Sequence, residues 1–135
     1  MIILDTHVWV WWVSGDAALS AVHRDLIREQ EAIGIAISPM SCWEVAMLFD
    51  RGRLVASVGA LEWIERAVKY PGVRLVELSP RIAVDSTTLP GDFHRDPADR
   101  ILVATARALD CPLITADARI LEYPHVRTVG PTLKR

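Results

Sequence analysis

The sequence predicts an α/β fold in which a mostly parallel sheet is covered by helices. Short apolar runs alternate along the chain with amphipathic stretches, which is the pattern of repeated strand–helix–strand units. The chain has 135 residues, of which 51% are hydrophobic and 24% charged, and this is enough for one domain with a substantial core. We therefore expect residues 1–135 to form a single domain.

Five apolar segments are predicted to form the sheet. The first, residues 1–4, is entirely apolar, as expected for a buried parallel strand. The others are residues 33–38, 73–78, 112–115 and, as a short edge strand, 127–129.

Helices are predicted between these strands, starting near His7, over residues 20–27, 39–51, 60–69 and 80–88, and from Asp96 up to Asp110. Ser20 is a favourable N-cap for one of them, and Gly52 is a natural terminator for another. The clearest start is Asp96-Pro97-Ala98-Asp99, because aspartate is a strong N-cap, proline suits the first helical position, and a second acid suits the helix dipole. As the N-cap, Asp96 should accept a hydrogen bond from the amide of Asp99.

The composition argues for a reducing compartment. Residues 1–13 are apolar but lack the basic start of a signal peptide and are interrupted by Asp5 and His7. No stretch approaches the roughly 20 apolar residues of a membrane span. Cys42 and Cys111 are isolated, with no CxxC spacing, and are interpreted as reduced core residues. We expect a cytoplasmic protein without membrane contact.

Four acidic residues, Asp5, Glu44, Asp99 and Asp117, stand where strands end or helices begin. Asp5 and Asp117 each follow an apolar run, so both are expected at the carboxyl ends of buried strands, where open α/β sheets bind ligands. Two carboxylates ~5 Å apart repel by about 3 kcal/mol at an effective dielectric constant of ~20. Four converging carboxylates should therefore either spread apart or hold a metal ion.

These ligand types favour a hard divalent cation. Oxygen donors without nearby thiolates or paired histidines favour Mg²⁺ or Mn²⁺ over zinc. Such an ion assists phosphodiester hydrolysis without a protein nucleophile, and the sequence contains no convincing Ser–His–Asp or Cys–His arrangement. The net charge is −2, but once the four acids are set aside, 13 acidic residues face 15 basic ones. This balance permits a phosphate-bearing substrate.

Four short segments stand out by their combination: ILDTH at residues 3–7, SPMSCWE at 38–44, HRDPADRI at 94–101 and LITAD at 113–117. Together they resemble the PIN domain and, more narrowly, the VapC-type toxin ribonucleases of toxin–antitoxin pairs. The resemblance covers nearly the whole chain. It implies a three-layer α/β/α sandwich with a mostly parallel central sheet, a Mg²⁺ or Mn²⁺ site, and endonucleolytic cleavage of RNA. It also implies a cognate antitoxin protein as partner and a homodimer.

Carried over residue by residue, the resemblance assigns metal binding and catalysis to Asp5, Glu44, Asp99 and Asp117. Asp117 stands where some relatives have asparagine before a later acid, and here no acid follows until Glu122. Taken by itself, Asp5 also has a purely structural interpretation, because aspartate after a strand often caps the next helix. For Glu44 the alternative is simple exposure to solvent on its helix.

Several neighbouring residues are candidates for holding the ligands or the substrate. Thr6, Ser41 and Thr115 lie close to the acids in sequence, and Thr115 is the strongest candidate for a hydrogen bond to a ligand. His7 and His94 are expected near the site in packing or hydrogen-bonding roles.

The turn before Asp99 carries further candidates. Asp96 is interpreted as a structural N-cap, with a water-mediated metal contact as the alternative. Arg95 and Arg100 flank this turn and either bind substrate phosphates or pair with the neighbouring aspartates.

The five tryptophans exceed what the core of so small a domain usually needs. We expect the helix carrying Trp9 and Trp12, and the Trp63-Ile64 region, to be partly covered by a second copy or an antitoxin, with core packing as the alternative for any one of them. Two other functions stay open: a non-catalytic interaction module, and a small phosphatase with Asp5 as nucleophile.

Overall fold

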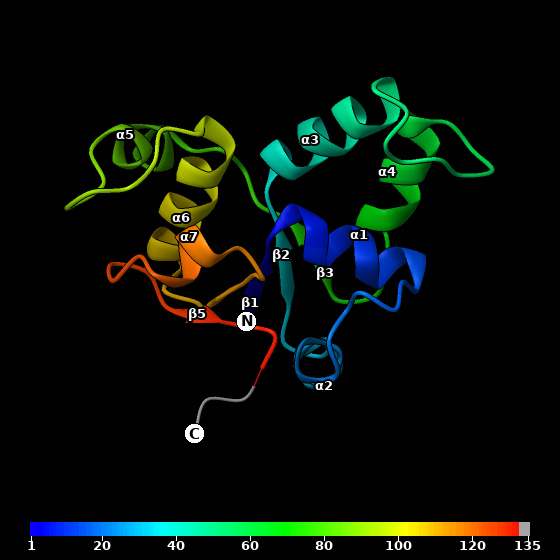
Figure 1. The fold of residues 1–135 in the computed structure, drawn as a ribbon, viewed down its shortest axis with the longest axis horizontal. Coiled ribbons are helices and arrows are strands. Elements are labelled where there is room, and N and C mark those ends of the chain that lie inside the picture. Colours follow the sequence, from blue (N-terminus) through cyan, green and yellow to red (C-terminus); the bar gives the residue numbers. More distant parts are fainter. Residues whose placement is uncertain (133–135) are drawn as a thin grey trace.

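The structure is a computed structural model that describes residues 1–132, and a parallel five-stranded sheet runs through its middle (Figure 1). The strand order is β3-β2-β1-β4-β5, and every neighbouring pair is parallel. The strands are β1 (Ile2–Leu4), β2 (Ile35–Ile37), β3 (Val73–Leu75), β4 (Leu113–Ile114) and β5 (Thr128–Val129). The helices are α1 (Thr6–Ser14), α2 (Ala21–Gln30), α3 (Pro39–Asp50), α4 (Ala60–Val68), α5 (Pro80–Thr87), α6 (Pro97–Leu109) and α7 (Ala118–Leu121).

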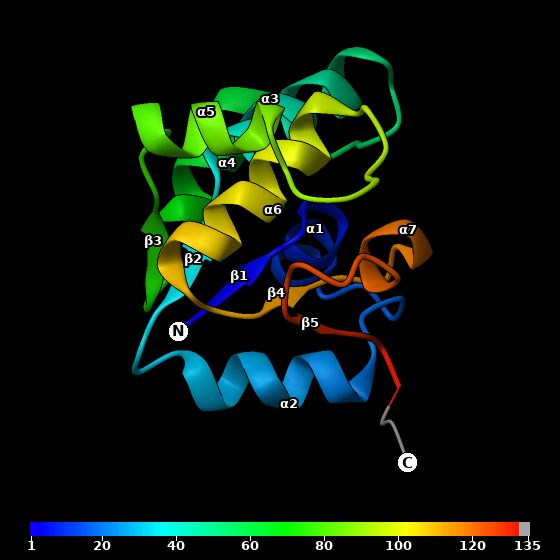
Figure 2. The same ribbon diagram turned by 90° about the vertical axis from the view of Figure 1, so that its left-hand side faces the viewer.

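Helices cover both faces of the sheet, so the predicted three-layer α/β/α sandwich is confirmed. Alternation along β1 places Ile2 and Leu4 in one apolar cluster and Ile3 in the other. The first cluster takes in side chains from α1, α2, α3 and α4, and the second takes in side chains from α5, α6 and α7. Figures 1 and 2 show these two groups on opposite sides of the sheet. Both faces of β1 are buried, which explains why every residue of this strand is apolar.

All five strands occur where they were predicted, but they are shorter. The strand expected over residues 73–78 ends sooner, because the Val76 amide donates the last bond to the Ile37 carbonyl, at 2.9 Å, before the chain leaves the sheet. The strand expected over 33–38 stops before Ser38, whose hydroxyl instead accepts a backbone N–H in the first turn of α3.

Capping residues set the helix starts. Asp96 Oδ1 accepts the amide N–H of Asp99 at 3.1 Å, which confirms the predicted N-cap of α6. The four-residue helix α7, capped by Asp117, was not predicted because so short a helix leaves no periodic pattern. Within residues 1–132 no helix is long and apolar enough to cross a membrane.

Two of the tryptophans expected at an interface lie in the core instead. Trp9 is fully buried and Trp63 is 8% exposed, and their rings pack edge to face with centroids 5.4 Å apart. The prediction that partners cover these two residues was wrong, because α1 and α4 bury them against each other and the sheet. Trp43 on α3 is the exposed one, at 54%.

Truncating Trp63 should therefore destabilise the fold strongly. We expect Trp63→Ala to lower the free energy of unfolding by about 3–5 kcal/mol, since it removes a large buried ring. Trp43→Ala, at an exposed position, should change it by no more than about 0.5 kcal/mol. Urea denaturation of the two variants checks this, and equal losses would contradict the assignment of Trp63 to the core.

The N-cap of α6 generates a second prediction. Asp96→Ala should cost roughly 0.5–2 kcal/mol of stability, whereas Asp96→Asn should cost little because asparagine caps about as well. Thermal unfolding of both variants measures the difference. An Asp96→Asn variant as unstable as Asp96→Ala would mean that charge, not capping, is the stabilising contribution of Asp96.

Candidate active site

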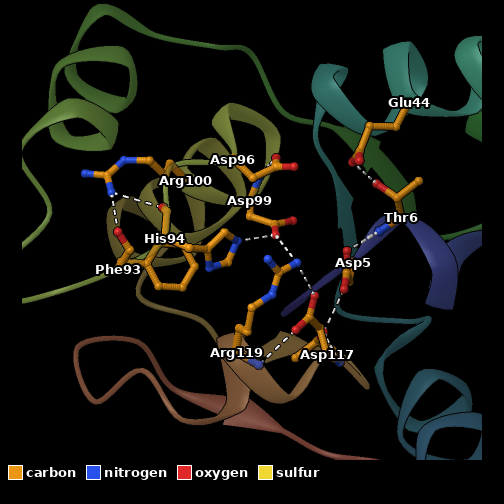
Figure 3. A network of polar contacts seen from close by, with 11 residues as sticks. Asp5, Thr6, Glu44, Phe93, His94, Asp96, Asp99, Arg100, Asp117 and Arg119 are labelled. Carbon is orange, nitrogen blue, oxygen red and sulfur yellow. Dashed lines mark hydrogen bonds and ion pairs between the residues drawn. The ribbon is translucent and has the colours of Figure 1, made fainter.

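The four acids identified from the sequence line one cavity of about 370 Å³ at the carboxyl edge of the sheet. Because β2, β1 and β4 are neighbours, the segments that follow them begin side by side. Asp5 follows β1, Glu44 lies on α3 after β2, and Asp117 follows β4. Asp99 comes from the first turn of α6 and completes the group (Figure 3).

Asp5 is buried, with 7% of its surface exposed, and both of its oxygens are hydrogen bonded. Oδ1 accepts the Thr6 amide at 2.7 Å, which caps α1, and Oδ2 accepts the Thr115 hydroxyl at 2.7 Å. Burial raises the pKa of Asp5, although these two hydrogen bonds oppose the rise. Asp5 therefore caps a helix and lines the cavity at the same time.

Glu44 is held by a short chain of hydroxyls. The Thr6 hydroxyl donates to Glu44 Oε1 at 2.6 Å, and the Ser41 Oγ lies 2.9 Å from the Thr6 oxygen. Because the single hydroxyl proton of Thr6 goes to Glu44, the Ser41 hydroxyl donates to Thr6. Burial raises the pKa of Glu44, and the Asp5 and Asp99 carboxylates raise it further against the lowering effect of the Thr6 hydrogen bond.

Asp99 is buried and contacts a histidine. His94 Nε2 lies 2.6 Å from Asp99 Oδ2, and in the tautomer that carries the Nε2 proton it donates to the carboxylate. Burial raises the pKa of Asp99, the His94 hydrogen bond lowers it, and the Asp5 and Asp96 carboxylates raise it again. The cap bond to Asp96 uses only the backbone amide of Asp99, so the Asp99 side chain lines the cavity.

Asp117 differs from the other three acids because it is partly open to solvent and lies beside a cation. Its Oδ1 accepts the Arg119 amide at 2.8 Å, and Arg119 Nη2 lies 3.5 Å from Asp117 Oδ2 and 3.9 Å from Asp99 Oδ2. Partial burial acts to raise the pKa of Asp117, but the amide and the guanidinium of Arg119 outweigh it, so the pKa is lowered. The sequence analysis missed Arg119, for which the spacing from the N-cap Asp117 was the only signal.

Thr115 binds two of the acids, whereas the sequence suggested only a hydrogen bond to one of them. Its hydroxyl donates to Asp5 Oδ2 and accepts the Asp117 amide at 3.0 Å. The side chain is fully buried, so this link is shielded from water.

The carboxylates surround a shared cavity but do not meet at one point. Among residues 1–132, no three His, Cys, Asp or Glu side chains are grouped closely enough to hold one ion. Each acid is instead turned toward a protein donor: a hydroxyl for Asp5 and Glu44, an imidazole for Asp99 and an arginine for Asp117. This is the spread arrangement that like-charge repulsion favours.

Arg100 has a different role from either one considered in the sequence analysis. Its guanidinium donates to the backbone carbonyls of Ser86 at 2.7 Å, Phe93 at 3.0 Å and His94 at 3.2 Å. These bonds fasten the loop before α6, and within residues 1–132 Arg100 makes no ion pair with Asp96 or Asp99. Arg95 is exposed, and its side chain makes no hydrogen bond or ion pair with any other residue between 1 and 132.

Comparison with known proteins identifies the family of this chain. A family model described as PIN domain matches residues 2–126. Ribonuclease VapC22 of Mycobacterium tuberculosis is 32% identical over 128 residues, which cover 95% of each chain.

Solved structures share the fold at lower identity. The VapBC2 complex of Rickettsia felis bound to a DNA fragment from its promoter contains a chain with a TM-score of 0.72 at 13% identity, with coverage of 96% of this chain and 98% of the other. A toxin–antitoxin complex of Klebsiella pneumoniae contains one with a TM-score of 0.66 at 21% identity, with coverage of 98% of each. The family match over most of the sequence and the relative at 32% identity show that this chain belongs to the PIN domain family.

Proposed function

We propose that this chain is an endoribonuclease that cleaves RNA phosphodiester bonds with Mg²⁺ or Mn²⁺, and that it is the toxin of a toxin–antitoxin pair. The observation that carries the proposal is that Asp5, Glu44, Asp99 and Asp117 reach one cavity from four separate segments. The ribonuclease name of the relative at 32% identity supports RNA as the substrate. We assign residues 1–135 to one nuclease domain, which the family match over 2–126 supports.

The donor set fits a hard divalent cation. The four candidate ligands are all carboxylates, and neither Cys42 nor Cys111 lines the cavity. Burial and mutual repulsion raise the pKa values of three of them, and a bound cation would relieve both effects. When bound, the metal would activate water and neutralise charge at the phosphate.

The residues around the acids act as positioning groups. Thr6, Thr115 and His94 each bind one carboxylate, and Ser41 orients the Thr6 hydroxyl. Partners of this kind orient metal ligands, and their removal typically costs 10–100-fold in metal affinity or activity.

Two exposed arginines are assigned to the substrate. Arg119 lies beside Asp99 and Asp117, and its planar guanidinium suits a bidentate phosphate contact. Arg95 is exposed and precedes Asp96 in the sequence, and we assign it as a second phosphate contact. Asp96 itself stays a structural residue of the site, because its carboxylate caps α6.

The partners follow from the same proposal. Several structural neighbours are toxin–antitoxin complexes, which supports a cognate antitoxin protein as partner. The exposed apolar side chains of Val55, Leu61 and Val84 offer surface that such a partner or a second copy in a homodimer would cover. We place the protein in the cytoplasm, where its RNA substrate lies and where its two free cysteines stay reduced.

Cleavage should depend on a divalent metal. We expect purified protein to cut single-stranded RNA in Mg²⁺ or Mn²⁺, to stop when excess chelator is added, and to recover when the metal is restored, because the buried carboxylates otherwise repel the phosphodiester. Gel analysis of labelled RNA measures this, with a melting curve in chelator as the control for folding. Cleavage that continues undiminished in chelator would rule out the metal mechanism.

Removing a single ligand charge should abolish activity while the fold stays intact. Glu44→Gln and Asp99→Asn should each lower the cleavage rate at least about a hundredfold, the upper end of what loss of an outer-shell partner costs. Asp96→Asn, which keeps the cap, and Glu65→Gln, at an exposed position on α4, should both retain activity. If Asp96→Asn is inactive and Asp99→Asn is active, the two roles are reversed. An interaction module would show no metal-dependent cleavage even in the wild type.

Glu44→Gln should also change how stability depends on pH. The pKa of Glu44 is raised in the folded state, so as pH rises the unfolded chain loses this proton first. The wild-type protein therefore loses stability between the ordinary glutamate pKa and the raised one. The glutamine side chain does not titrate, so the variant does not lose stability in this way. Without metal, the melting temperature of the variant relative to the wild type should rise across this window and then level off. A difference that stays constant with pH would contradict the raised pKa.

A further inference from the structure

A second cavity, of about 300 Å³, lies next to the acid cavity and shares His7, Glu44 and Asp96 with it. Its walls come from one face of α3, the start of α1 and the start of α6. The other lining residues are Thr6, Met40, Trp43, Met47, Leu48, Arg51, Pro97 and Ala98. We call this cavity the Trp43 groove. Because Glu44 lines both cavities, an occupant of the Trp43 groove lies directly beside a group bound at the carboxylates.

Helix α3 presents an apolar face to the Trp43 groove as well as to the core. Met40, Trp43 and Met47 recur at spacings of three and four residues, so they lie on the same side of the helix. Val45 lies on the core side and is fully buried. On the groove side the indole of Trp43 is 54% exposed and is open to a ligand.

The two ends of the groove differ in charge. Glu44 and Asp96 lie at the end shared with the acid cavity, whereas Arg51 is exposed and lines the groove one helical turn beyond Met47. The groove therefore has an acidic end, where it meets the acid cavity, and a basic end, where Arg51 can attract a phosphate group.

We propose that the Trp43 groove binds an unstacked nucleobase of the RNA strand next to the scissile phosphate, with the base stacked on the indole of Trp43. Aromatic side chains are the usual platforms for unpaired bases, because every base presents a π-face. The inference rests on the proposed nuclease function and extends it by naming the residue that contacts the base.

The size of the groove favours a base over a segment of a partner protein. About 300 Å³ is the lower end of the range for small-ligand pockets, which suits a single planar group. A partner helix needs a series of anchor sites along a longer groove. Continuity with the acid cavity through Glu44 points the same way, because the substrate strand must leave the carboxylates along one of their open sides.

Steady-state cleavage of a short single-stranded RNA tests the proposal. Trp43→Ala should lower kcat/KM roughly tenfold to a hundredfold, mainly through KM, whereas Trp43→Phe should keep most of the activity. Trp43→Leu, which is apolar but has no ring, should resemble the alanine variant. Ile33→Ala, at a 55% exposed position outside both cavities, is the control and should behave as wild type.

An abasic substrate makes the test specific to stacking. In the wild type, removing the base at one position next to the cleavage site should cost the same factor as Trp43→Ala. In Trp43→Ala, removing that base should cost nothing more, because the shared contact is already lost. Independent, multiplicative losses, or wild-type kinetics in Trp43→Ala, would overturn the proposal while the nuclease function stands.

Binding measured without cleavage separates failure of this inference from failure of the proposed function. Anisotropy of a labelled RNA should show weaker binding to Glu44→Gln/Trp43→Ala than to Glu44→Gln alone. Absence of cleavage by the wild type would refute the nuclease function, and equal RNA affinity of these two variants would refute the base site. If Trp43→Ala leaves RNA binding and cleavage unchanged but dissociates an antitoxin complex or a dimer in sedimentation, the groove is a protein interface and the proposal is wrong.

Discussion

Mutual repulsion among carboxylates at the carboxyl edge of a buried sheet is the constraint around which this site is built. Each acid has a compensating donor. The buried Asp5 and Asp99 are bound by a hydroxyl and an imidazole, whereas the more exposed Asp117 lies beside the charged Arg119. The pKa directions follow the same division, raised for the buried acids and lowered for Asp117. In the proposed function, protons and a divalent cation would therefore compete for the interior of this cavity.

Helix capping and the lining of the acid cavity use the same side chains. Asp5 caps α1 and Asp117 caps α7, and in each case one carboxylate oxygen accepts a backbone amide while the other reaches a second partner. The cap limits how the carboxylate can rotate, so a helix start after a strand delivers an oriented acid to the sheet edge. Asp96 caps α6 and leaves Asp99, three residues on, to line the cavity. Capping and ligand roles, which looked like alternatives for Asp5, are thus compatible.

Helix α3 connects the core to the proposed substrate surface. Val45 packs in the core, Glu44 lines the acid cavity, and Trp43 lines the adjoining groove. Three consecutive residues serve three environments because successive side chains on a helix point about 100° apart. In the proposed function, this arrangement ties the position of a base to the position of a catalytic carboxylate through one rigid element.

The sequence alone determined the α/β class, the succession along the chain of the five strands and of six of the seven helices, and the four candidate acids. These depend on local signals: apolar runs for the strands, capping residues such as Asp96, and acids directly after buried strands. The membership of the PIN domain family, which the resemblance implied, also rests on the order of motifs along the chain.

Only the tertiary structure decided which side chains meet. Trp9 and Trp63 are far apart in sequence, and their packing against each other could not be read from composition. From its place in the sequence, Arg100 was expected either to bind phosphate or to pair with the neighbouring aspartates, but it binds the carbonyls of Ser86 and Phe93, which lie outside α6. Arg119 was overlooked because its place beside the acid cavity depends on the short helix α7, which was not predicted, and on its approach to Asp99 on another helix. Contacts of this kind depend on how the helices pack across the sheet, and no local pattern encodes that geometry.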